Sequence, residues 1–252
     1  MTAVHQMKGF LQKFVVLDID GVLLRGGSVI PGASQAVQRL AKHRIPFIFV
    51  TNGGGMLESV KATELSNKLE MPIRPSQVVV CHTPWRDLVG KYNDSRVLVL
   101  GGQPRCVEVA KSYGFTQAVS VDDIHRENVH IYPLRKPSIG NSKNVQHDKI
   151  SSHSKKVKAV MVFHDPVDWG LEMQVLSDVL RPSHPLDTNT KMVNNTGSQQ
   201  IPFYVSNDDL VYTTEHPVPR FTQGAFTTAF KQLYEAFHDK PLQIQYYGKP
   251  FP

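Results

Sequence analysis

The chain has 252 residues, of which 40% are hydrophobic and 20% charged, a composition typical of folded proteins and not of disordered tails. Its 28 lysines and arginines exceed its 22 aspartates and glutamates, which gives a formal net charge of +6. This charge favours anionic partners in general. No basic run longer than Lys155-Lys156, no basic-aromatic module and no zinc-ligand spacing accompanies it, so we expect no nucleic-acid partner.

Cysteine usage and apolar runs exclude two further classes. Cys81 and Cys106 are the only cysteines, so a disulfide scaffold is excluded and a reducing compartment is expected, with both thiols buried as small hydrophobes. No run of about 18 apolar residues occurs, so we expect no membrane span. Residues 1–13 carry two lysines and no acid, which is too little to establish a targeting segment.

Short apolar runs alternate with helical periodicity along the first 80 residues. The run at 14–17 is continuous, which predicts a strand buried on both faces. Such alternation is typical of a doubly wound α/β fold with a parallel sheet and right-handed crossovers. In chain order we expect a strand at 14–17, a helix at 33–43, a strand at 47–50, a helix at 57–69 with Val60, Leu65 and Leu69 facing inward, and a strand at 78–81.

The same pattern begins again after Arg96 and predicts a second, smaller α/β unit. Two polar stretches interrupt it, at 137–156 and 182–200, and we expect both to be mobile insertions. The expected elements are strands at 97–100, 159–163, 203–205 and 244–247 and helices at 107–113, 169–180 and 224–237, the last with Phe226, Phe230, Leu233, Tyr234 and Phe237 on one face.

Two acidic side chains, Asp18 and Asp20, follow the first predicted strand with one residue between them. Positions i and i+2 of a strand point to the same face, and ligands of open α/β sheets bind at the carboxyl ends of the strands. Close carboxylates repel each other, and a divalent cation is one way to hold them together. One ionised acid can attack as a nucleophile while the other, with a raised pKa, donates a proton. Acidic pairs at strand ends also line turns, so this pair alone leaves a structural role open.

Two further strings carry groups that suit a phosphate. Thr51-Asn52-Gly53-Gly54-Gly55 follows the second predicted strand and offers a hydroxyl, an amide and unhindered backbone N–H groups. Gly248-Lys249-Pro250 follows the last predicted strand and brings a fixed positive charge, which could neutralise phosphoryl oxygens. Taken singly, the first string is a weak signal and the second is more often a surface turn.

In this order the three strings resemble the motifs of the haloacid dehalogenase superfamily of phosphohydrolases. Asp18 to Leu23 is similar to motif I, Thr51 with Asn52 to motif II, and Lys249 to motif III. The long segment between motifs II and III is similar to the cap of subfamily IIA, a domain that lies over the active site and selects the substrate.

This resemblance covers residues 14–252, nearly the whole chain. It implies an α/β fold of the haloacid dehalogenase type, a doubly wound parallel sheet with a Rossmann-like core and an inserted α/β cap. The core would comprise residues 1–92 and 216–252, and the cap residues 93–215.

The resemblance further implies a Mg-dependent phosphatase that acts on a small phosphorylated metabolite through an aspartyl-phosphate. Asp18 would be the nucleophile and Asp20 the acid and then the base. Lys249 would stabilise the charge of the transferred phosphoryl group, which Thr51 and the backbone of Asn52 and Gly53 would hold. The Asp18 carboxylate and the Asp20 backbone carbonyl would be two Mg²⁺ ligands. In the cap, four residues would contact the substrate: His164, Asp165, Asn207 and Asp208. For His164, a histidine whose hydrogen bonds are satisfied at a strand end is an equal interpretation.

One departure from the family pattern lies at the end of the sequence. Chains of subfamily IIA continue past Gly-Lys-Pro to an acidic motif IV, whose strand lies beside the motif I strand and supplies a further Mg²⁺ ligand. No such string follows Lys249, and the acidic pairs at 122–123 and 208–209 precede it. We therefore expect weakened Mg²⁺ binding and an unpaired edge on the first strand, as in a truncated isoform, an incompletely predicted gene or a fragment. The alternative function is a catalytically impaired binding or regulatory protein.

The resemblance implies a mitochondrial location, with the cytoplasm as the alternative, and a partner-binding role in mitochondria is a third hypothesis. The sequence leaves the oligomeric state open, with a homodimer among the alternatives. It carries no recognisable code for the identity of the phosphorylated substrate.

Overall fold

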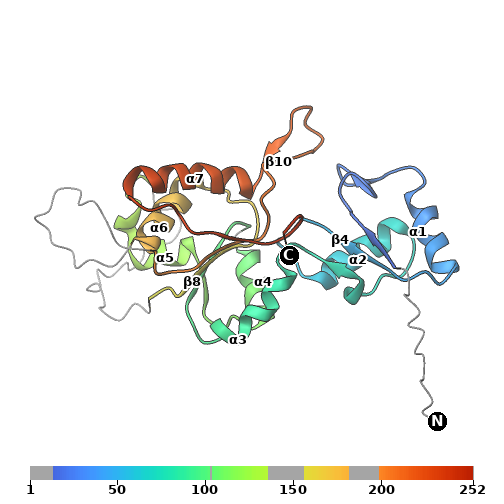
Figure 1. Cartoon of the computed structure of the whole chain (residues 1–252), viewed down its shortest axis with the longest axis horizontal. Coiled ribbons are helices and arrows are strands. Elements are labelled where there is room, and N and C mark those ends of the chain that lie inside the picture. The colour runs from blue at the N-terminus through green and yellow to red at the C-terminus, as the bar shows by residue number, and fades with distance from the viewer. Residues whose placement is uncertain (1–13, 103, 136–155, 182–198, 252) are drawn as a thin grey trace, which may run out of the picture. The chain divides into compact units, whose positions relative to one another are not determined.

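The computed structural model of the chain describes residues 14–102, 104–135, 156–181 and 199–251 (Figure 1). The chain divides into two compact units, each of which is described by itself. Unit 1 comprises Met1–Val50 and Glu58–Val79, and unit 2 comprises Thr51–Leu57 and Val80–Pro252.

Unit 1 is built on a small parallel sheet with the strand order β1-β4-β5. The register pairs Leu17 with Phe49 and Val50 with Val79, so the three strands end at the same edge of the sheet. The predicted parallel α/β arrangement is confirmed here. The elements are β1 (Val15–Leu17), β2 (Leu24–Arg25), β3 (Ser28–Val29), α1 (Ala33–Lys42), β4 (Phe47–Val50), α2 (Glu58–Leu69), the 3-10 helix η1 (Pro75–Gln77) and β5 (Val78–Val79).

Two burial predictions for unit 1 are wrong. Val60 is 54% exposed, because α2 buries the stripe formed by Ala62, Leu65 and Leu69, and Val60 lies about 200° around the helix from Ala62. Val16 of β1 is 53% exposed, so this strand is not buried on both faces. Within the described part of the chain β1 pairs with β4 alone and forms an edge of the sheet.

Unit 2 contains a sheet of five parallel strands in the order β12-β9-β8-β6-β7. The predicted second α/β unit is therefore confirmed, but its predicted smaller size is wrong, because it comprises most of the chain and its sheet has five strands where that of unit 1 has three. Its elements are the 3-10 helix η2 (Thr83–Leu88), α3 (Val89–Tyr92), β6 (Val97–Leu100), α4 (Arg105–Tyr113), β7 (Ala118–Ser120), α5 (Val121–Glu127), the 3-10 helix η3 (Val129–Ile131), β8 (Ala159–Val162), α6 (Trp169–Leu180), β9 (Phe203–Val205), β10 (Val211–Tyr212), β11 (Arg220–Phe221), α7 (Gln223–Phe237) and β12 (Gln245–Tyr246).

Helices cover both faces of this sheet, because successive side chains of a strand point to opposite faces (Figure 1). In β6, Val97 and Val99 face a cluster that includes α4, whereas Leu98 and Leu100 face a cluster that includes α6 and α7. All four β6 side chains are buried, as the continuous apolar run predicts.

Helix α7 buries a narrower stripe than the sequence predicts. Phe226, Phe230 and Tyr234, spaced four residues apart, are buried in the cluster on the α6 side. Leu233 and Phe237 are exposed, so their predicted inward orientation is wrong. The helix contacts the sheet along one line of residues, and side chains beside that line reach solvent.

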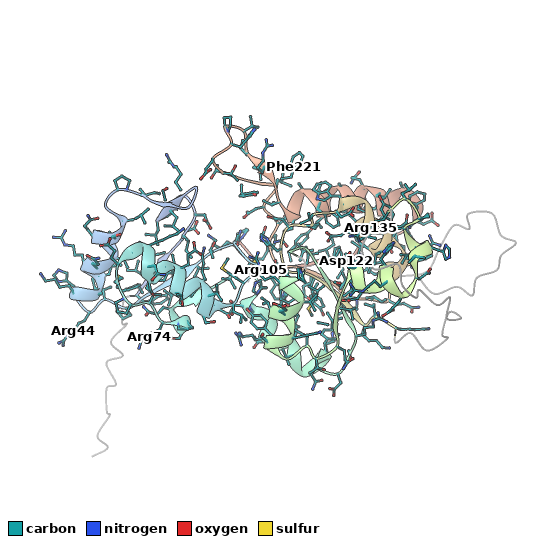
Figure 2. All side chains as sticks on the ribbon, turned by 180° about the vertical axis from the view of Figure 1, so that it is seen from behind. Arg44, Arg74, Arg105, Asp122, Arg135 and Phe221 are labelled. Carbon is teal, nitrogen blue, oxygen red and sulfur yellow. The ribbon has the colours of Figure 1, made fainter. Side chains whose placement is uncertain are left out.

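A β-hairpin, β10 with β11, extends from unit 2 ahead of α7 (Figure 1). Its apolar side chains are exposed, and Phe221 at its base is 71% exposed (Figure 2). Elsewhere on this unit, the side chains of Asp122 and Arg135 form an ion pair (Figure 2).

The boundaries of the two compact units differ from the predicted boundaries of the core and the cap. Helix α7 and strand β12, which the sequence assigns to the core, pack in unit 2 with β9. The assignment of a substrate-selecting cap to residues 93–215 stays a prediction. The polar stretches 137–156 and 182–200 lie almost wholly outside the described residues. Among the described helices, none has the length and apolar character needed to cross a membrane.

Candidate functional site

The ten predicted site residues divide between the two units. Asp18 and Asp20 belong to unit 1. The other eight belong to unit 2, which brings several of them into one network of hydrogen bonds: Thr51, Asn52, Gly53, His164, Asp165, Asn207, Asp208 and Lys249.

In unit 1 the chain turns sharply after β1. The half-buried Asp18 accepts a hydrogen bond from the Ile19 backbone N–H at 2.8 Å through its own carboxylate. Gly21 has a φ of +84° and donates its N–H to the Leu24 carbonyl oxygen at 2.7 Å, which reverses the chain into β2. Asp20 stands in this turn and is exposed. The two acids therefore follow a strand end, where the sequence places them.

In unit 2 the segment Thr51–Gly55, here called the glycine loop, begins with a local side-chain contact. The Thr51 hydroxyl oxygen accepts the Gly53 backbone N–H at 2.9 Å, and this threonine is almost fully buried. Gly54 lies so close to its neighbours that an added Cβ would lie 2.6 Å from Cys81 Sγ and 2.8 Å from the Phe163 carbonyl oxygen. Only glycine fits there.

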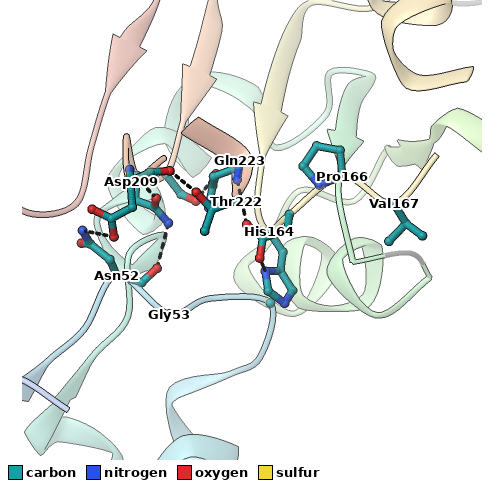
Figure 3. Close-up of polar contacts among 12 residues, drawn as sticks. Asn52, Gly53, His164, Pro166, Val167, Asp209, Thr222 and Gln223 are labelled. Atoms are coloured by element: carbon teal, nitrogen blue, oxygen red, sulfur yellow. Dashed lines mark hydrogen bonds and ion pairs between the residues drawn. The ribbon is translucent and has the colours of Figure 1, made fainter. Parts of the chain in front are cut away.

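The glycine loop is tied to the Gly248-Lys249-Pro250 string by the side chain of Asn52. Asn52 Oδ1 accepts the Lys249 backbone N–H at 2.8 Å, and Asn52 Nδ2 donates to the Lys249 carbonyl oxygen at 3.0 Å. The second hydrogen of Nδ2 is donated to an Asp209 carboxylate oxygen at 2.9 Å (Figure 3). Asn207 completes the network, because its Nδ2 donates to the Asn52 carbonyl oxygen at 2.8 Å.

His164 and Asp165 follow β8 and form a close pair. The His164 Nδ1 and an Asp165 carboxylate oxygen are 3.6 Å apart, and the other oxygen accepts the Gln223 backbone N–H at 2.8 Å (Figure 3). Burial lowers the pKa of His164, and the positive charge of Arg105 adds to this effect. Burial raises the pKa of Asp165. Both shifts disfavour the charged forms of the two side chains.

A buried carboxylate supports the loop that carries this pair. Glu172 of α6 is 1% exposed and accepts backbone N–H groups from Val167 at 2.9 Å, Asp168 at 3.3 Å and Gly101 at 3.1 Å. Burial raises its pKa, while these three hydrogen bonds act in the opposite direction. Glu172 thus joins the segments that follow β6 and β8.

Sequence reasoning did not assign Asp209 to the site, although it stands beside Asp208 in an acidic pair. Thr222 holds Asp209 in place by donating its hydroxyl to the Asp209 carbonyl oxygen (Figure 3). Burial raises the pKa of Asp208, and the charge of Asp209 raises it further. Asp209, and not Asp208, contacts Asn52 directly. The two residues are 157 positions apart, so the sequence gives no signal for this contact.

Among the described residues, no three histidine, cysteine, aspartate or glutamate side chains group in a way that could hold a metal ion. The predicted burial of Cys81 and Cys106 is confirmed, and both thiols are free.

Two comparisons of sequence relate the chain to known hydrolases. Residues 15–116 match the family described as haloacid dehalogenase-like hydrolase. A mitochondrial hydrolase of Saccharomyces cerevisiae is 39% identical over 233 residues, which are 92% of this chain and 65% of the yeast protein. The chain therefore spans somewhat less than two thirds of that relative.

Solved structures show the same fold at low identity. A possible sugar phosphatase of the haloacid dehalogenase superfamily from Cytophaga hutchinsonii superposes with a TM-score of 0.64 at 15% identity, over 96% of this chain and 70% of its own. A glycerol phosphate phosphatase from Mycobacterium tuberculosis, solved with magnesium, has a TM-score of 0.56 at 15% identity, over 88% of this chain and 51% of its own.

Proposed function

Because residues 15–116 match the haloacid dehalogenase-like hydrolases and a mitochondrial hydrolase is 39% identical to this chain, we propose that the chain belongs to this family and hydrolyses the phosphate ester of a small metabolite. The observation that carries the proposal is the clamp between Asn52 and Lys249. These two hydrogen bonds fix the backbone of Lys249, a residue with a positive side chain, beside the glycine loop and its threonine, and such groups suit a phosphate. The named phosphatases with this fold support the same reaction class.

In the proposed reaction the Asp18 carboxylate attacks phosphorus, and the bond from phosphorus to the ester oxygen breaks. Asp20 gives its proton to the departing oxygen. Asp20 then takes a proton from water, whose oxygen attacks the aspartyl-phosphate and regenerates the Asp18 carboxylate with release of inorganic phosphate. We assign the phosphoryl oxygens to Thr51 and to the backbone of Asn52 and Gly53, where a bound phosphoryl group would compete with Thr51 Oγ1 for the Gly53 N–H.

We assign stabilisation of the phosphoryl charge and selection of the substrate to other residues of the chain. The ammonium group of Lys249 stabilises the charge of the transferred phosphoryl group. We assign recognition of the rest of the substrate to His164, Asp165, Asn207 and Asp208. Asn207 makes its contribution through its contact to the Asn52 carbonyl oxygen, because its side chain is almost fully buried.

The donor chemistry of the acid pair fits Mg²⁺. Magnesium is commonly held by one or two carboxylates together with water and the phosphate of a substrate, and a set of two acids after β1 suits this arrangement. The Asp18 carboxylate and the Asp20 carbonyl oxygen would be its ligands. When bound, Mg²⁺ would neutralise negative charge on the phosphoryl oxygens. We also propose a mitochondrial location, in line with the name of the yeast relative.

The test is hydrolysis of p-nitrophenyl phosphate by the full chain with and without Mg²⁺, beside its Asp18→Asn variant. Glu70→Gln, which changes an exposed acid of the same unit, is the matched control. We expect Mg-dependent turnover that Asp18→Asn removes and Glu70→Gln leaves unchanged. If folded wild-type chain binds inorganic phosphate without turnover, the proposal fails and the binding or regulatory function takes its place.

A further inference from the structure

His82 is a buried histidine to which the proposed reaction gives no role. Its side chain is fully enclosed in unit 2, immediately before η2. Both ring nitrogens have partners: the Gly55 backbone N–H donates to Nε2 at 3.1 Å, and Nδ1 lies 2.9 Å from the Tyr113 hydroxyl oxygen. Since a buried polar ring without partners is costly, these two contacts account for a histidine at this position.

The two contacts also fix where the ring carries its proton. A backbone N–H can only donate, so Nε2 of His82 is the acceptor and bears no hydrogen. The proton of the neutral ring therefore lies on Nδ1 and is donated to the Tyr113 hydroxyl oxygen. A second proton on Nε2 would remove the bond to Gly55.

Aromatic neighbours hold the His82 ring in this orientation. The ring centroids of Phe163 and Tyr113 lie 5.1 Å and 5.6 Å from that of His82. The Arg86 guanidinium lies 4.0 Å from the Tyr113 ring centroid and covers that ring from another side. The Trp85 backbone N–H donates to the His82 carbonyl oxygen at 3.1 Å, which fixes the backbone as well. His82 is thus a rigid support.

The segment that rests on this support is the glycine loop. Gly55 has a φ of +74°, and an added Cβ at Gly54 would lie 3.1 Å from His82 Cδ2. The loop is therefore in direct contact with the ring and is fixed at its far end by the hydrogen bond from Gly55. At its near end the Gly53 N–H is held by Thr51. Contacts at both ends leave the backbone between them little freedom.

We propose that His82 is a positioning residue for the glycine loop: its Nε2 holds the Gly55 amide and so sets the direction in which the loop presents its backbone to a phosphate. This inference rests on the proposed function and extends it to a residue that does not touch the substrate. His82 acts through Gly55, and its unprotonated Nε2 is the essential atom.

Substitution of His82 by glutamine or by asparagine tests the contacts of the two ring nitrogens separately. Glutamine can place an acceptor oxygen where Nε2 lies, whereas asparagine can reach only the position of Nδ1. We expect His82→Gln to keep the Gly55 bond and the wild-type KM for p-nitrophenyl phosphate. We expect His82→Asn to raise this KM and the inhibition constant for inorganic phosphate by about tenfold, the effect of one lost buried hydrogen bond. The matched controls are His130→Gln and His130→Asn, since His130 is exposed in the same unit.

A second readout does not depend on activity. Hydrogen exchange of the Gly55 amide, followed by NMR on the full chain, should be about tenfold faster in His82→Asn than in His82→Gln. The ¹⁵N shifts of the wild-type ring should show a protonated Nδ1 and an unprotonated Nε2. If the wild-type chain lacks phosphatase activity but the exchange difference is found, the positioning role stands and the proposed reaction fails.

Equal Gly55 exchange in the two variants, with both folded to the same melting temperature, would overturn the proposal and leave His82 as a core residue. A ring protonated on Nε2 would overturn it as well. If both variants fail to fold, the ring shifts of the wild-type chain and the exchange of Gly55 in Tyr113→Phe decide. This variant keeps the aromatic ring, and slow Gly55 exchange in it is the expected result.

Discussion

The side-chain amide of Asn52 pairs with both backbone polar groups of Lys249. Oδ1 accepts the Lys249 N–H at 2.8 Å and Nδ2 donates to the Lys249 carbonyl oxygen at 3.0 Å, so one side chain imitates a neighbouring strand. Residues that are 197 positions apart in the sequence are thereby joined by two hydrogen bonds between a side chain and a backbone.

Asn52→Asp should break this clamp while changing the size of the side chain very little. The new carboxylate cannot donate to the Lys249 carbonyl oxygen and would repel Asp209, whose carboxylate now accepts from Nδ2 at 2.9 Å. We expect a loss of about 1–3 kcal/mol in the free energy of unfolding of unit 2, measured in urea. Activity toward p-nitrophenyl phosphate should fall at least tenfold.

Asn67→Asp makes the same chemical change at an exposed position of α2 and should leave both quantities unchanged. Adding Asp209→Asn to Asn52→Asp exchanges donor and acceptor between the two side chains. This double variant should recover part of the stability and little of the activity, because the Lys249 carbonyl oxygen still lacks its donor. Full activity in Asn52→Asp would contradict a role for the clamp.

Gly101→Ala should destabilise unit 2 strongly. Gly101 has a φ of +77°, and an added Cβ would lie 1.8 Å from the His164 carbonyl oxygen, a backbone atom that cannot move aside cheaply. We expect a loss of about 3 kcal/mol or more in the free energy of unfolding, with lowered activity because the segment of His164 must shift. Gly90→Ala, at a position with nothing within 4 Å of the added atom, should be neutral or slightly stabilising. Thermal or urea unfolding of the two variants checks both.

The start of α5 should lose stability in acid. Burial alone would raise the pKa of Asp123, but hydrogen bonds from Ser120 and the neighbouring Arg126 outweigh it, and the pKa lies below its usual value. A lowered carboxylate pKa adds stability above the unfolded value near 3.8, and this stability is lost as the pH falls through the folded value. Asp123→Asn should therefore cost up to about 1 kcal/mol at pH 7, and this cost should shrink as the pH falls below 3.8 and through the folded pKa.

Urea unfolding of wild type and Asp123→Asn at a series of pH values measures this difference. Asp239→Asn, at an exposed position, should follow the wild-type curve throughout. A constant difference between Asp123→Asn and wild type from pH 7 to pH 2 would show that the carboxylate charge is not the cause.

The sequence predicts most long elements of the fold closely. Continuous apolar runs predict β4, β6 and β9 with the observed bounds, and helical periodicity predicts α6 from Trp169 to Leu180. The hairpins β2-β3 and β10-β11 were not predicted, because their strands have two residues each and carry no detectable period. Helix α5 was missed because its signal is a capping contact between Ser120 and Asp123 and not an apolar stripe.

The site was predicted less completely than the fold. Strand ends and glycines locate the Asp18 pair and the glycine loop, since these features are local in sequence. Asp209 and His82 act through contacts with residues that are 157 and 27 positions away, and only the folded chain brings these together. The Asp209 carboxylate accepts from the side chain of Asn52, and His82 accepts from the backbone of Gly55, and neither contact leaves a mark in the pattern of residue types.

The two cysteines should be unreactive toward thiol reagents in the folded chain. Burial raises the pKa of both Cys81 and Cys106 to about 12, and the thiolate is the nucleophile that reacts with thiol reagents. In the folded chain neither sulfur should therefore react at neutral pH, and their modification would report local opening around Gly54 and Gly102, the glycines that pack on them. A cysteine introduced at an exposed site such as Glu215 could then carry a fluorescent or spin label with no need to remove the natural ones.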